Sequence, residues 1–578
     1  MLQLLLHTVL ISLICIIWGI PAYFLLKKDE AEKYWIGNGL TFFSFLFFSG
    51  LLTISLISSW LIIFIPLTSN YFFIISTILA LFFRFRYKKE INEIAKTLGP
   101  INIRFSGWSL FIFVTILLLL LLGTLKPVNP DTQLYHLQII RWTNEYGVVP
   151  GMANIYPRLG LGSNWFNLIS LFHIPSLNHQ NFTFLNTSVT IWFLLWLMGK
   201  FHYYASSPES KNNRILVFFY FLVTGYFLFD WQLFRDTSNS TAYDFIVTIL
   251  ITFCLSYFIE NILKNESRQK HSIYFFFTSI SVISFKLSGA SILVLIIIAL
   301  INEKSTKLLF KTLILSAIIL FPVLIKNHIT TGYILYPSLI SVDNPDWQMP
   351  ANMAGYFKEY IINSNRYYNH QFGTIDTLEK NQFKWIPFWF NGILLKHKLL
   401  LGLSLTSLLL LFFNPLKSIN TARLKQFIFG LWIMIAGWFF MAPDPRFAFG
   451  VLLFAAFLPL SIWYGEKLPI KIYPIIFLIF SAGVLIYAYS KSGYLIKKPV
   501  HFAYPVENDK PPFSELSIHG IPFNEPQIIN QNWNNRCFFT PLPCICEKNP
   551  YLQPRGNDLS DGFIMKKPDS NFIKHYNY

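Results

Sequence analysis

Residues 107–125 read GWSLFIFVTILLLLLLGTL, and residues 127–166 continue as PVNPDTQLYHLQIIRWTNEYGVVPGMANIYPRLGLGSNWF. The first segment carries no charge and has the length that a bilayer crossing requires, about 20 apolar residues. The second segment puts acidic, histidine and arginine side chains and a row of aromatics where the chain leaves the membrane. Polar residues of this kind at a bilayer surface indicate a function. We interpret residues 127–166 as the first wall of a candidate active site.

Apolar runs recur along the chain, which is 54% hydrophobic and only 13% charged. They centre near residues 2–26, 37–57, 60–83, 107–125, 181–199, 214–230, 243–260, 272–285, 287–301, 308–325, 398–413, 426–441, 447–463 and 472–490. Most of these runs are too long for strands or ordinary buried helices. The sequence therefore predicts an all-α polytopic membrane protein with about fourteen transmembrane helices, interfacial helices in its outer loops and a small outer C-terminal region.

The surplus of 46 basic over 29 acidic side chains gives a formal charge of +17. In a membrane protein this excess is typical of cytoplasmic loops, so we expect no nucleic-acid partner. The basic clusters near residues 84–89, 264–270, 304–307 and 417–425 all fall on one side of the predicted bundle, which we interpret as cytoplasmic. Nearly all large polar segments then lie outside, which is typical of an enzyme with an outer-face substrate.

The same pattern divides the chain into five parts. We expect N-terminal spans with a basic cytoplasmic loop over 1–106, a core over 107–325 with its first outer loop at 126–180, a large outer loop over 326–397, further spans over 398–490 and an outer tail over 491–578.

Asp131 precedes a stretch in which Tyr135, Ile139, Trp142 and Tyr146 recur at helical spacing. This pattern predicts an amphipathic helix in the interface plane, with its aromatic side chains at headgroup depth. Asp131 has two compatible roles, as the N-cap of that helix and as a proton acceptor at the membrane surface. His136, which follows Tyr135, is a candidate for substrate binding or for an ordinary interfacial hydrogen bond.

Two cations lie on the predicted outer side of the bundle, although Lys and Arg are usually enriched on the cytoplasmic side. Lys286 interrupts SFKLSG between two runs too short to span, and Arg446 lies in the short turn MAPDPRFAFG. Lys286 either extends to the headgroups or awaits an anionic ligand. Arg158, in the Gly- and Pro-rich part of the first outer loop, and Asp244, at the start of a span, are further candidates for ligand contacts. Asp244 also fits a helix cap.

The tail segment CFFTPLPCIC contains Cys537, Cys544 and Cys546, with no histidine close by in sequence. In an extracytoplasmic tail this pattern favours a disulfide over a metal site, and we expect Cys537 to pair with Cys544.

Several short motifs together resemble the GT-C superfamily of integral-membrane glycosyltransferases. They are DTQLYHLQIIRW with VPGMANIYPRLG, the short runs interrupted by Lys286, KNHITTGYILYPS with the later PDW, APDPRFAFG and CFFTPLPC. They extend from about residue 107 to 560 and are similar to a bacterial branch related to the protein mannosyltransferases and the aminoarabinose transferase of lipid A. Each motif is degenerate, so the resemblance depends on their order and sidedness.

The resemblance implies transfer of a sugar from a polyprenyl-phosphate donor to an envelope glycan, lipid or protein acceptor, on the outer face of a bacterial inner membrane. Asp131 would be the base, with Lys286 and Arg446 on the donor phosphate. The family often has two adjacent acids where this chain has Asp131 and Thr132, so a divalent metal has no paired acidic motif to support it. A single displacement would invert the sugar carbon.

Tyr135, His136, Arg158 and Asp244 remain candidates for substrate binding. Three alternatives stay open: an O-antigen polymerase or ligase, a carrier or flippase for lipid-linked envelope precursors, and a noncatalytic component of an envelope assembly. A carrier is expected to show an internal repeat, and we find none that is convincing.

Overall fold

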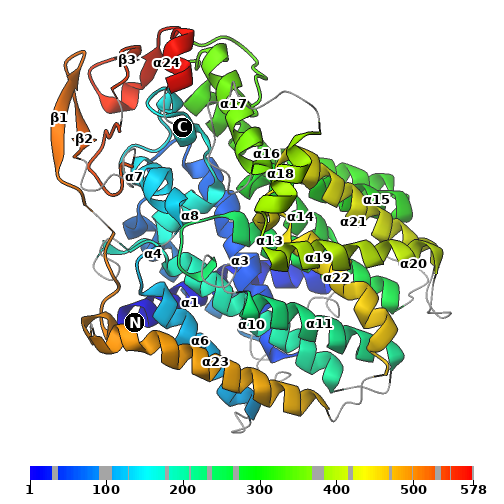
Figure 1. Cartoon of the computed structure of the whole chain (residues 1–578). Helices are drawn as coiled ribbons and strands as arrows, with labels where there is room; N and C mark the ends of the chain where they lie inside the picture. The colour runs from blue at the N-terminus through cyan, green and yellow to red at the C-terminus, as the bar shows by residue number, and fades with distance from the viewer. Residues whose placement is uncertain are drawn as a thin grey trace.

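The computed structural model describes residues 1–28, 37–89, 107–127, 129–175, 181–206, 210–230, 237–264, 272–367, 383–413, 421–467, 472–497, 499–508, 510–527, 536–546 and 548–575. Within these ranges the chain is mostly helical, with a small β region near the C-terminus (Figure 1). The helices of the first half are α1 (Leu2–Lys28), α3 (Gly39–Leu61), α4 (Ser69–Arg86), α6 (Gly107–Gly123), η1 (Thr132–His136), α7 (Leu137–Glu145), η2 (Met152–Asn154), η3 (Pro157–Gly160), α8 (Asn164–Phe172), α10 (Phe184–Ala205), α11 (Lys211–Phe229), α13 (Asp244–Leu263) and α14 (Ile273–Phe285).

The remaining helices are η4 (Leu287–Ile292), α15 (Leu293–Glu303), α16 (Thr306–Thr331), α17 (Ala351–Arg366), α18 (Trp385–Gly392), α19 (Leu395–Leu405), η6 (Thr406–Leu408), α20 (Leu409–Phe412), α21 (Thr421–Met441), η7 (Pro445–Phe447), α22 (Phe449–Tyr464), α23 (Ile472–Lys497), η8 (Pro499–Phe502), η10 (Leu559–Asp561) and α24 (Ser570–His575). The strands are β1 (Phe513–Ile518), β2 (Ile521–Pro526), β3 (Leu552–Pro554) and β4 (Phe563–Met565).

Eight of the described helices are long and apolar enough to cross a membrane. They are Leu2–Phe24, Gly39–Leu61, Phe184–Ala205, Lys211–Phe229, Asp244–Leu263, Thr306–Thr331, Leu395–Phe412 and Thr421–Met441. Shorter apolar helices cover Ser109–Gly123, Ile273–Phe285, Leu287–Glu303, Phe449–Tyr464 and Leu478–Tyr487. The protein is thus a multi-pass membrane protein. Each of the fourteen predicted runs contains a helix, but only eight meet the length and apolarity of a span.

The expected run over residues 60–83 is divided in the structure. Helix α3 ends at Leu61, the chain turns, and α4 begins at Ser69. Pro66 lies in the turn, where it disfavours helical backbone at the residue before it. The turn lies beside the first outer loop, because the Leu67 amide donates to the Thr143 carbonyl at 3.0 Å. Helix α4 starts here and ends in the basic residues Arg84 and Arg86.

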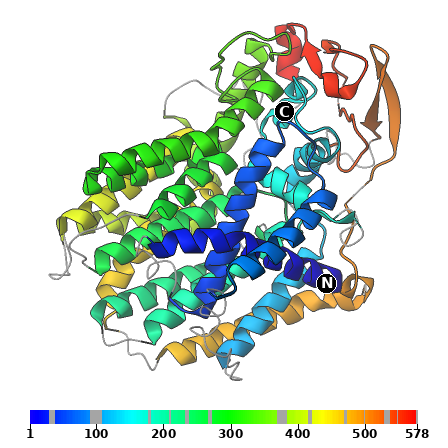
Figure 2. The same cartoon turned by 180° about the vertical axis from the view of Figure 1, so that it is seen from behind.

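Helices α1 and α3 pack backbone to backbone, as the dark-blue and blue helices that cross in Figure 2 show. A Cβ added to Gly19 would lie 2.0 Å from the Leu46 carbonyl oxygen, and one added to Gly50 would lie 1.7 Å from the Cys15 oxygen. Small residues allow such close contact, which is how many membrane helices associate. The N-terminal amine donates to the His501 carbonyl at 2.9 Å, so the chain start lies against η8, the short helix that follows α23.

Helix α13 lies in the protein interior and α16 faces outward. All of the most apolar 18-residue window of α13 is buried, whereas only 22% of the corresponding window of α16 is. Phe310, Ile314 and Phe321 of α16 are among the exposed apolar side chains. Such a surface is stable only beside lipid, so α16 forms part of the membrane-facing perimeter.

Helix α14 ends early, and Lys286 follows it in extended backbone before η4 and α15. Its 13 residues rise only about 20 Å, less than the hydrocarbon core of about 30 Å. The chain therefore turns back inside the bundle, where η4 packs against α14 and α21.

The tail contains sheet, so the expectation of an all-α chain was wrong there. Strands β1 and β2 form an antiparallel hairpin, and β3 pairs with β4. His519 and Gly520 link β1 to β2 with φ of 49° and 87°, the left-handed backbone that two-residue hairpin turns require. In Figure 1 the β elements, α24 and α17 gather at the end of the molecule that also holds α7.

Residues 129–175, which were expected to belong to the first outer loop, fold into η1, α7, η2, η3 and α8. Their aromatic face is buried in the protein rather than placed among headgroups, because α8 and the tail cover it. Tyr135, Ile139 and Trp142 are at most 4% exposed. The Gln138 amide donates to the Phe538 and Thr540 carbonyls at 3.1 and 3.0 Å. This loop is therefore a structured wall of the protein.

Candidate functional site

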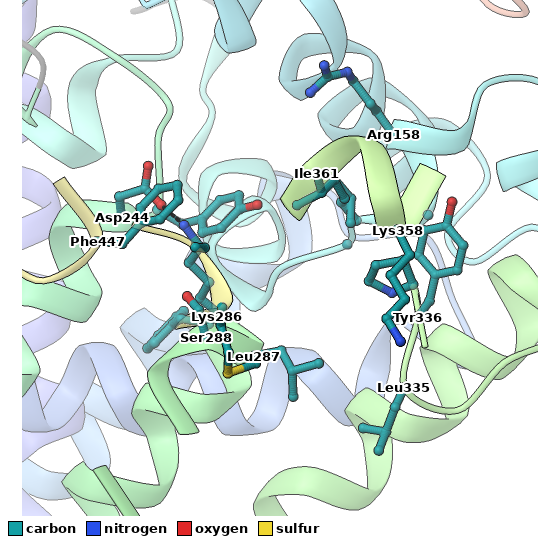
Figure 3. Close-up of a pocket in the computed structure, with 18 of the residues that line it drawn as sticks. Arg158, Asp244, Lys286, Leu287, Ser288, Leu335, Tyr336, Lys358, Ile361 and Phe447 are labelled. Carbon is teal, nitrogen blue, oxygen red and sulfur yellow. Dashed lines mark hydrogen bonds and ion pairs between the residues drawn. The ribbon is translucent and has the colours of Figure 1, made fainter. Parts of the chain in front are cut away.

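One cavity of about 710 Å³ collects the candidate residues of the sequence analysis. Its lining contains Asp131, Tyr135, His136, Arg158, Asp244, Lys286 and Arg446, which come from the η1–η3 segment, α13, the α14–η4 junction and η7. Figure 3 shows Asp244, Lys286 and Phe447 grouped at one end, with Lys358 and Tyr336 at the other. The fold thus unites side chains that are more than 300 positions apart in the sequence.

Asp131 does not cap a helix with its side chain. It stands at the N-cap of η1 with helical backbone and makes no side-chain cap hydrogen bond. Its Oδ2 instead lies 3.9 Å from Nη1 of Arg446, and the side chain is 23% exposed. Helix η1 is a single π-type turn, a feature often found at functional sites. The carboxylate is therefore available to a ligand in the cavity.

Lys286 and Asp244 form an ion pair across the cavity end, with Nζ 2.5 Å from Oδ1. The Lys286 ammonium also lies 3.1 Å from the centre of the Phe447 ring, a cation–π contact. Asp244 is the first residue of α13, and Tyr243 occupies the cap position, so the expected cap role was wrong. Its carboxylate neutralises the lysine instead.

Arg446 is surrounded by carboxylates. Its Nε lies 2.8 Å from Oδ2 of Asp444 and 4.0 Å from Oδ2 of Asp244, while Asp131 faces Nη1. Asp444 also accepts the Arg446 backbone N–H at 3.0 Å, which fixes the PDPRF turn. Asp444 is a site residue that was not predicted from the sequence; its position two residues before Arg446 in this turn was the available signal. Three carboxylates therefore meet two cations at this end.

His136 is buried beside the cavity and hydrogen-bonds through Nδ1 to the Thr241 hydroxyl at 2.9 Å. Burial lowers the pKa of His136 to about 4, although Asp131 and Asp244 oppose the shift. The ring is thus neutral near pH 7. Phe166 and Tyr135 pack against it at centroid distances of 4.8 and 4.4 Å. These contacts favour a positioning role over proton transfer.

Arg158 and helix α17 form the other side of the cavity. The Arg158 guanidinium lies over the rings of Tyr135 and Tyr360, at 5.8 and 5.6 Å from their centres. Lys358 of α17 also lines the cavity and is exposed. Lys358 and Tyr360 were not predictable from the sequence, because α17 carries no motif that distinguishes it from a connecting helix.

An apolar wall completes the cavity. It is formed by residues of α14, η4, α16 and α21, namely Ile283, Leu287, Leu320, Val323, Leu324 and Met441. Leu287 and Met441 are 40% and 61% exposed, and the adjacent Phe321 of α16 is 54% exposed. Polar groups and a membrane-facing apolar wall thus meet in one cavity, an arrangement that suits an amphipathic ligand.

The tail joins the site region through a disulfide-closed loop. Cys537 and Cys544 form the disulfide, the pair that the sequence favours. The Phe538 amide of this loop donates to the Gln133 carbonyl, and the Arg141 guanidinium donates to the Thr540 carbonyl at 2.9 Å. The loop therefore fastens the tail to η1 and α7, next to Asp131.

Cys546 lies beside the bridge, with its Sγ 3.3 Å from Sγ of Cys537. All three sulfur atoms fall within 4.8 Å of one another, which is close enough for a shared metal ion. Metals bind thiolates, however, and the disulfide removes two of the three. The oxidised cluster does not fit a metal centre.

Loss of Cys537 is expected to destabilise the tail more than loss of Cys544. In Cys544→Ser the nearby Cys546 can bridge to Cys537, whereas Cys537→Ser leaves no bridge. A loop of this size contributes about 2–3 kcal/mol in the chain-entropy account. Thermal unfolding with alkylation and peptide mass spectrometry measures both effects. If Cys537 and Cys546 of oxidised Cys544→Ser both react with the alkylating agent, the expectation is wrong.

Comparisons with known proteins give a family and no activity. No curated protein and no solved structure matches the chain. One family profile matches residues 1–453, which is more than half of the chain and includes every cavity residue named above. The chain belongs to the family described as a domain of unknown function, DUF8201.

Proposed function

We propose that the protein is a membrane glycosyltransferase that moves a sugar from a polyprenyl-phosphate donor to an envelope glycan, lipid or protein acceptor. The observation that carries the proposal is the cavity itself, where the carboxylate of Asp131 faces Arg446 and an apolar wall opens toward the membrane-facing α16. A soluble sugar nucleotide has no long apolar chain to bind this wall. A lipid-linked donor can place its sugar and phosphate at the polar end of the cavity and its polyprenyl chain against the apolar wall.

In the proposed reaction, the acceptor hydroxyl gives its proton to Asp131 as its oxygen bonds to the anomeric carbon. The bond between that carbon and the phosphate oxygen breaks, and the polyprenyl phosphate leaves with the electron pair. Attack opposite the leaving group inverts the sugar carbon. Arg446, which is 40% exposed, donates hydrogen bonds toward the negative charge that grows on the phosphate.

Asp131 suits the role of base better than its neighbours. Asp244 and Asp444 lie 2.5 and 2.8 Å from their cations, whereas the nearest cation to Asp131 is 3.9 Å away. Asp131 is also the most exposed of the three carboxylates, at 23%. The Lys286–Asp244 pair then forms one end of the pocket, where the Lys286 ammonium attracts the donor phosphate. The proposed chemistry needs no metal ion.

The number of membrane spans and the side on which the loops lie are part of the same proposal. We infer a GT-C-like bundle of about fourteen spans, in which the shorter apolar helices cross or re-enter the bilayer together with the eight long ones. The large loops and the C-terminal tail then lie on the outer face of a bacterial inner membrane. A disulfide in the tail supports that placement, since oxidising conditions favour such bridges.

A reconstituted transfer assay tests the proposal. The purified protein in lipid nanodiscs is mixed with polyprenyl-phosphate-linked sugars and an envelope extract, and release of polyprenyl phosphate is followed by mass spectrometry. The expected result is release that depends on both protein and acceptor. Movement of intact lipid across the bilayer without cleavage would favour a carrier instead. Cleavage only of diphosphate-linked glycans would favour a polymerase or ligase.

A further inference from the structure

Lys326 is a buried cation whose neighbours do not balance its charge. It lies near the outer end of α16 and is 6% exposed. Its Nζ donates to Oδ1 of Asn167 at 2.9 Å, the single hydrogen bond of this ammonium within the described residues. No carboxylate of the described ranges lies within 4.0 Å of that nitrogen. An ammonium has three donors, so the neutral amide of Asn167 leaves most of its charge uncompensated.

Gly162 separates Lys326 from the cavity. Gly162 is part of the cavity lining, and a Cβ added to it would lie 3.1 Å from Cε and 3.5 Å from Nζ of Lys326. The backbone of Gly162 is not left-handed, so its conformation does not require glycine. A larger residue would require the lysine side chain to shift by a few tenths of an ångström. Gly162 therefore lies beside this ammonium and also lines the cavity.

Two other cations of the cavity, Lys286 and Arg446, differ from Lys326 because carboxylates lie beside them. Lys286 is paired with Asp244, and Arg446 faces Asp131, Asp244 and Asp444. At this end of the cavity three carboxylates outnumber the two cations, so no positive charge is left over there for an added anion. Lys326 belongs to α16, and the next residue of that helix, Asn327, lines the cavity directly.

We propose that the cavity holds a phosphate group against Gly162 and that Lys326, behind this glycine, supplies its countercharge. The phosphate belongs to the lipid donor, a step that rests on the proposed function, or to a free phosphorylated molecule. Electrostatic attraction through one glycine needs no direct contact, since it is strong in a low-dielectric interior. Lys326 is thus a further binding residue, and Gly162 keeps the wall thin.

The test measures binding rather than transfer. Undecaprenyl phosphate, neutral undecaprenol and inorganic phosphate are titrated onto the full-length protein in nanodiscs, and dissociation constants are compared for wild type, Lys326→Met and Gly162→Ala. Lys311→Met, an exposed position on the same helix, is the matched control. Loss of this electrostatic attraction is expected to weaken phosphate affinity about tenfold in Lys326→Met. Undecaprenol affinity is expected to stay unchanged.

Each outcome separates this inference from the proposed function. Equal phosphate affinity in wild type, Lys326→Met and Gly162→Ala would overturn the role of Lys326, and so would a wild type that binds neither phosphate compound. If wild type binds inorganic phosphate through Lys326 but not undecaprenyl phosphate, the subsite stands and the lipid donor does not. Because Gly162→Ala retains the lysine, it tests the site even if Lys326→Met fails to fold.

Discussion

Asp131→Asn is expected to reduce sugar transfer about a thousandfold, within the range of general-base contributions. The substitution keeps the size of the side chain and removes its ability to take a proton from the acceptor. Arg446 keeps its partner Asp444 at 2.8 Å, so the adjoining turn retains its structure. The measurement is single-turnover release of polyprenyl phosphate by purified variants of equal thermal stability.

Glu145→Gln is the matched control for that experiment. Glu145 belongs to the same outer loop, is 41% exposed and pairs with Arg141 on the surface. Its loss is expected to leave the transfer rate within about twofold, since exposed ion pairs contribute little. Transfer by Asp131→Asn at the wild-type rate would remove Asp131 from the role of base.

Lys286→Met is expected to cost about 3 kcal/mol of stability, because it leaves the Asp244 carboxylate without its closest cation in a mostly buried place. Adding Asp244→Asn to the same chain is expected to recover most of that loss, since a neutral pair no longer carries an uncompensated charge. Denaturation in mixed micelles measures the free energy of unfolding of the wild type, the two single variants and the double variant.

The exposed pair of Lys211 and Glu466 provides the comparison for that cycle. Their side chains are 44% and 29% exposed, and Lys211→Met is expected to change stability by at most about 1 kcal/mol. If the double variant at Lys286 and Asp244 is as unstable as Lys286→Met alone, the pair does not explain the loss. A double variant that is stable but inactive would assign Lys286 to the ligand as well.

The sequence predicted which residues share the site better than it predicted which of them form ion pairs. The order of apolar runs and the sidedness of charge were enough to expect Asp131, Lys286 and Arg446 at one outer site, and one cavity contains them. That Asp244 binds Lys286 was not predictable, because the contact depends on how α13 meets the α14–η4 junction. Short sequence motifs do not determine the angles at which helices pack.

Three other features were not predicted, because the sequence around each of them resembles that of an ordinary membrane-protein segment. Lys326 follows a long apolar run, so its sequence is that of an ordinary anchor at the end of a span. Its burial and its contacts with Asn167 and Gly162 show that it faces inward. The π-type turn of η1 has no sequence signature. The β1–β2 hairpin was readable, since FSELSI and IPFNEP flank His-Gly, but a tail beside so many apolar helices did not suggest sheet.

The docking of the tail on η1 and α7 sets an order for biogenesis. Asn154 donates to the Phe563 carbonyl at 3.0 Å, and Gln138 reaches Thr540, contacts that join residues about 400 positions apart. The spans between them must be inserted before these contacts can form. The wall that carries Asp131 is thus completed only when the C-terminal tail has been synthesised, so a ribosome-bound intermediate can hold every cavity residue yet lack the finished site.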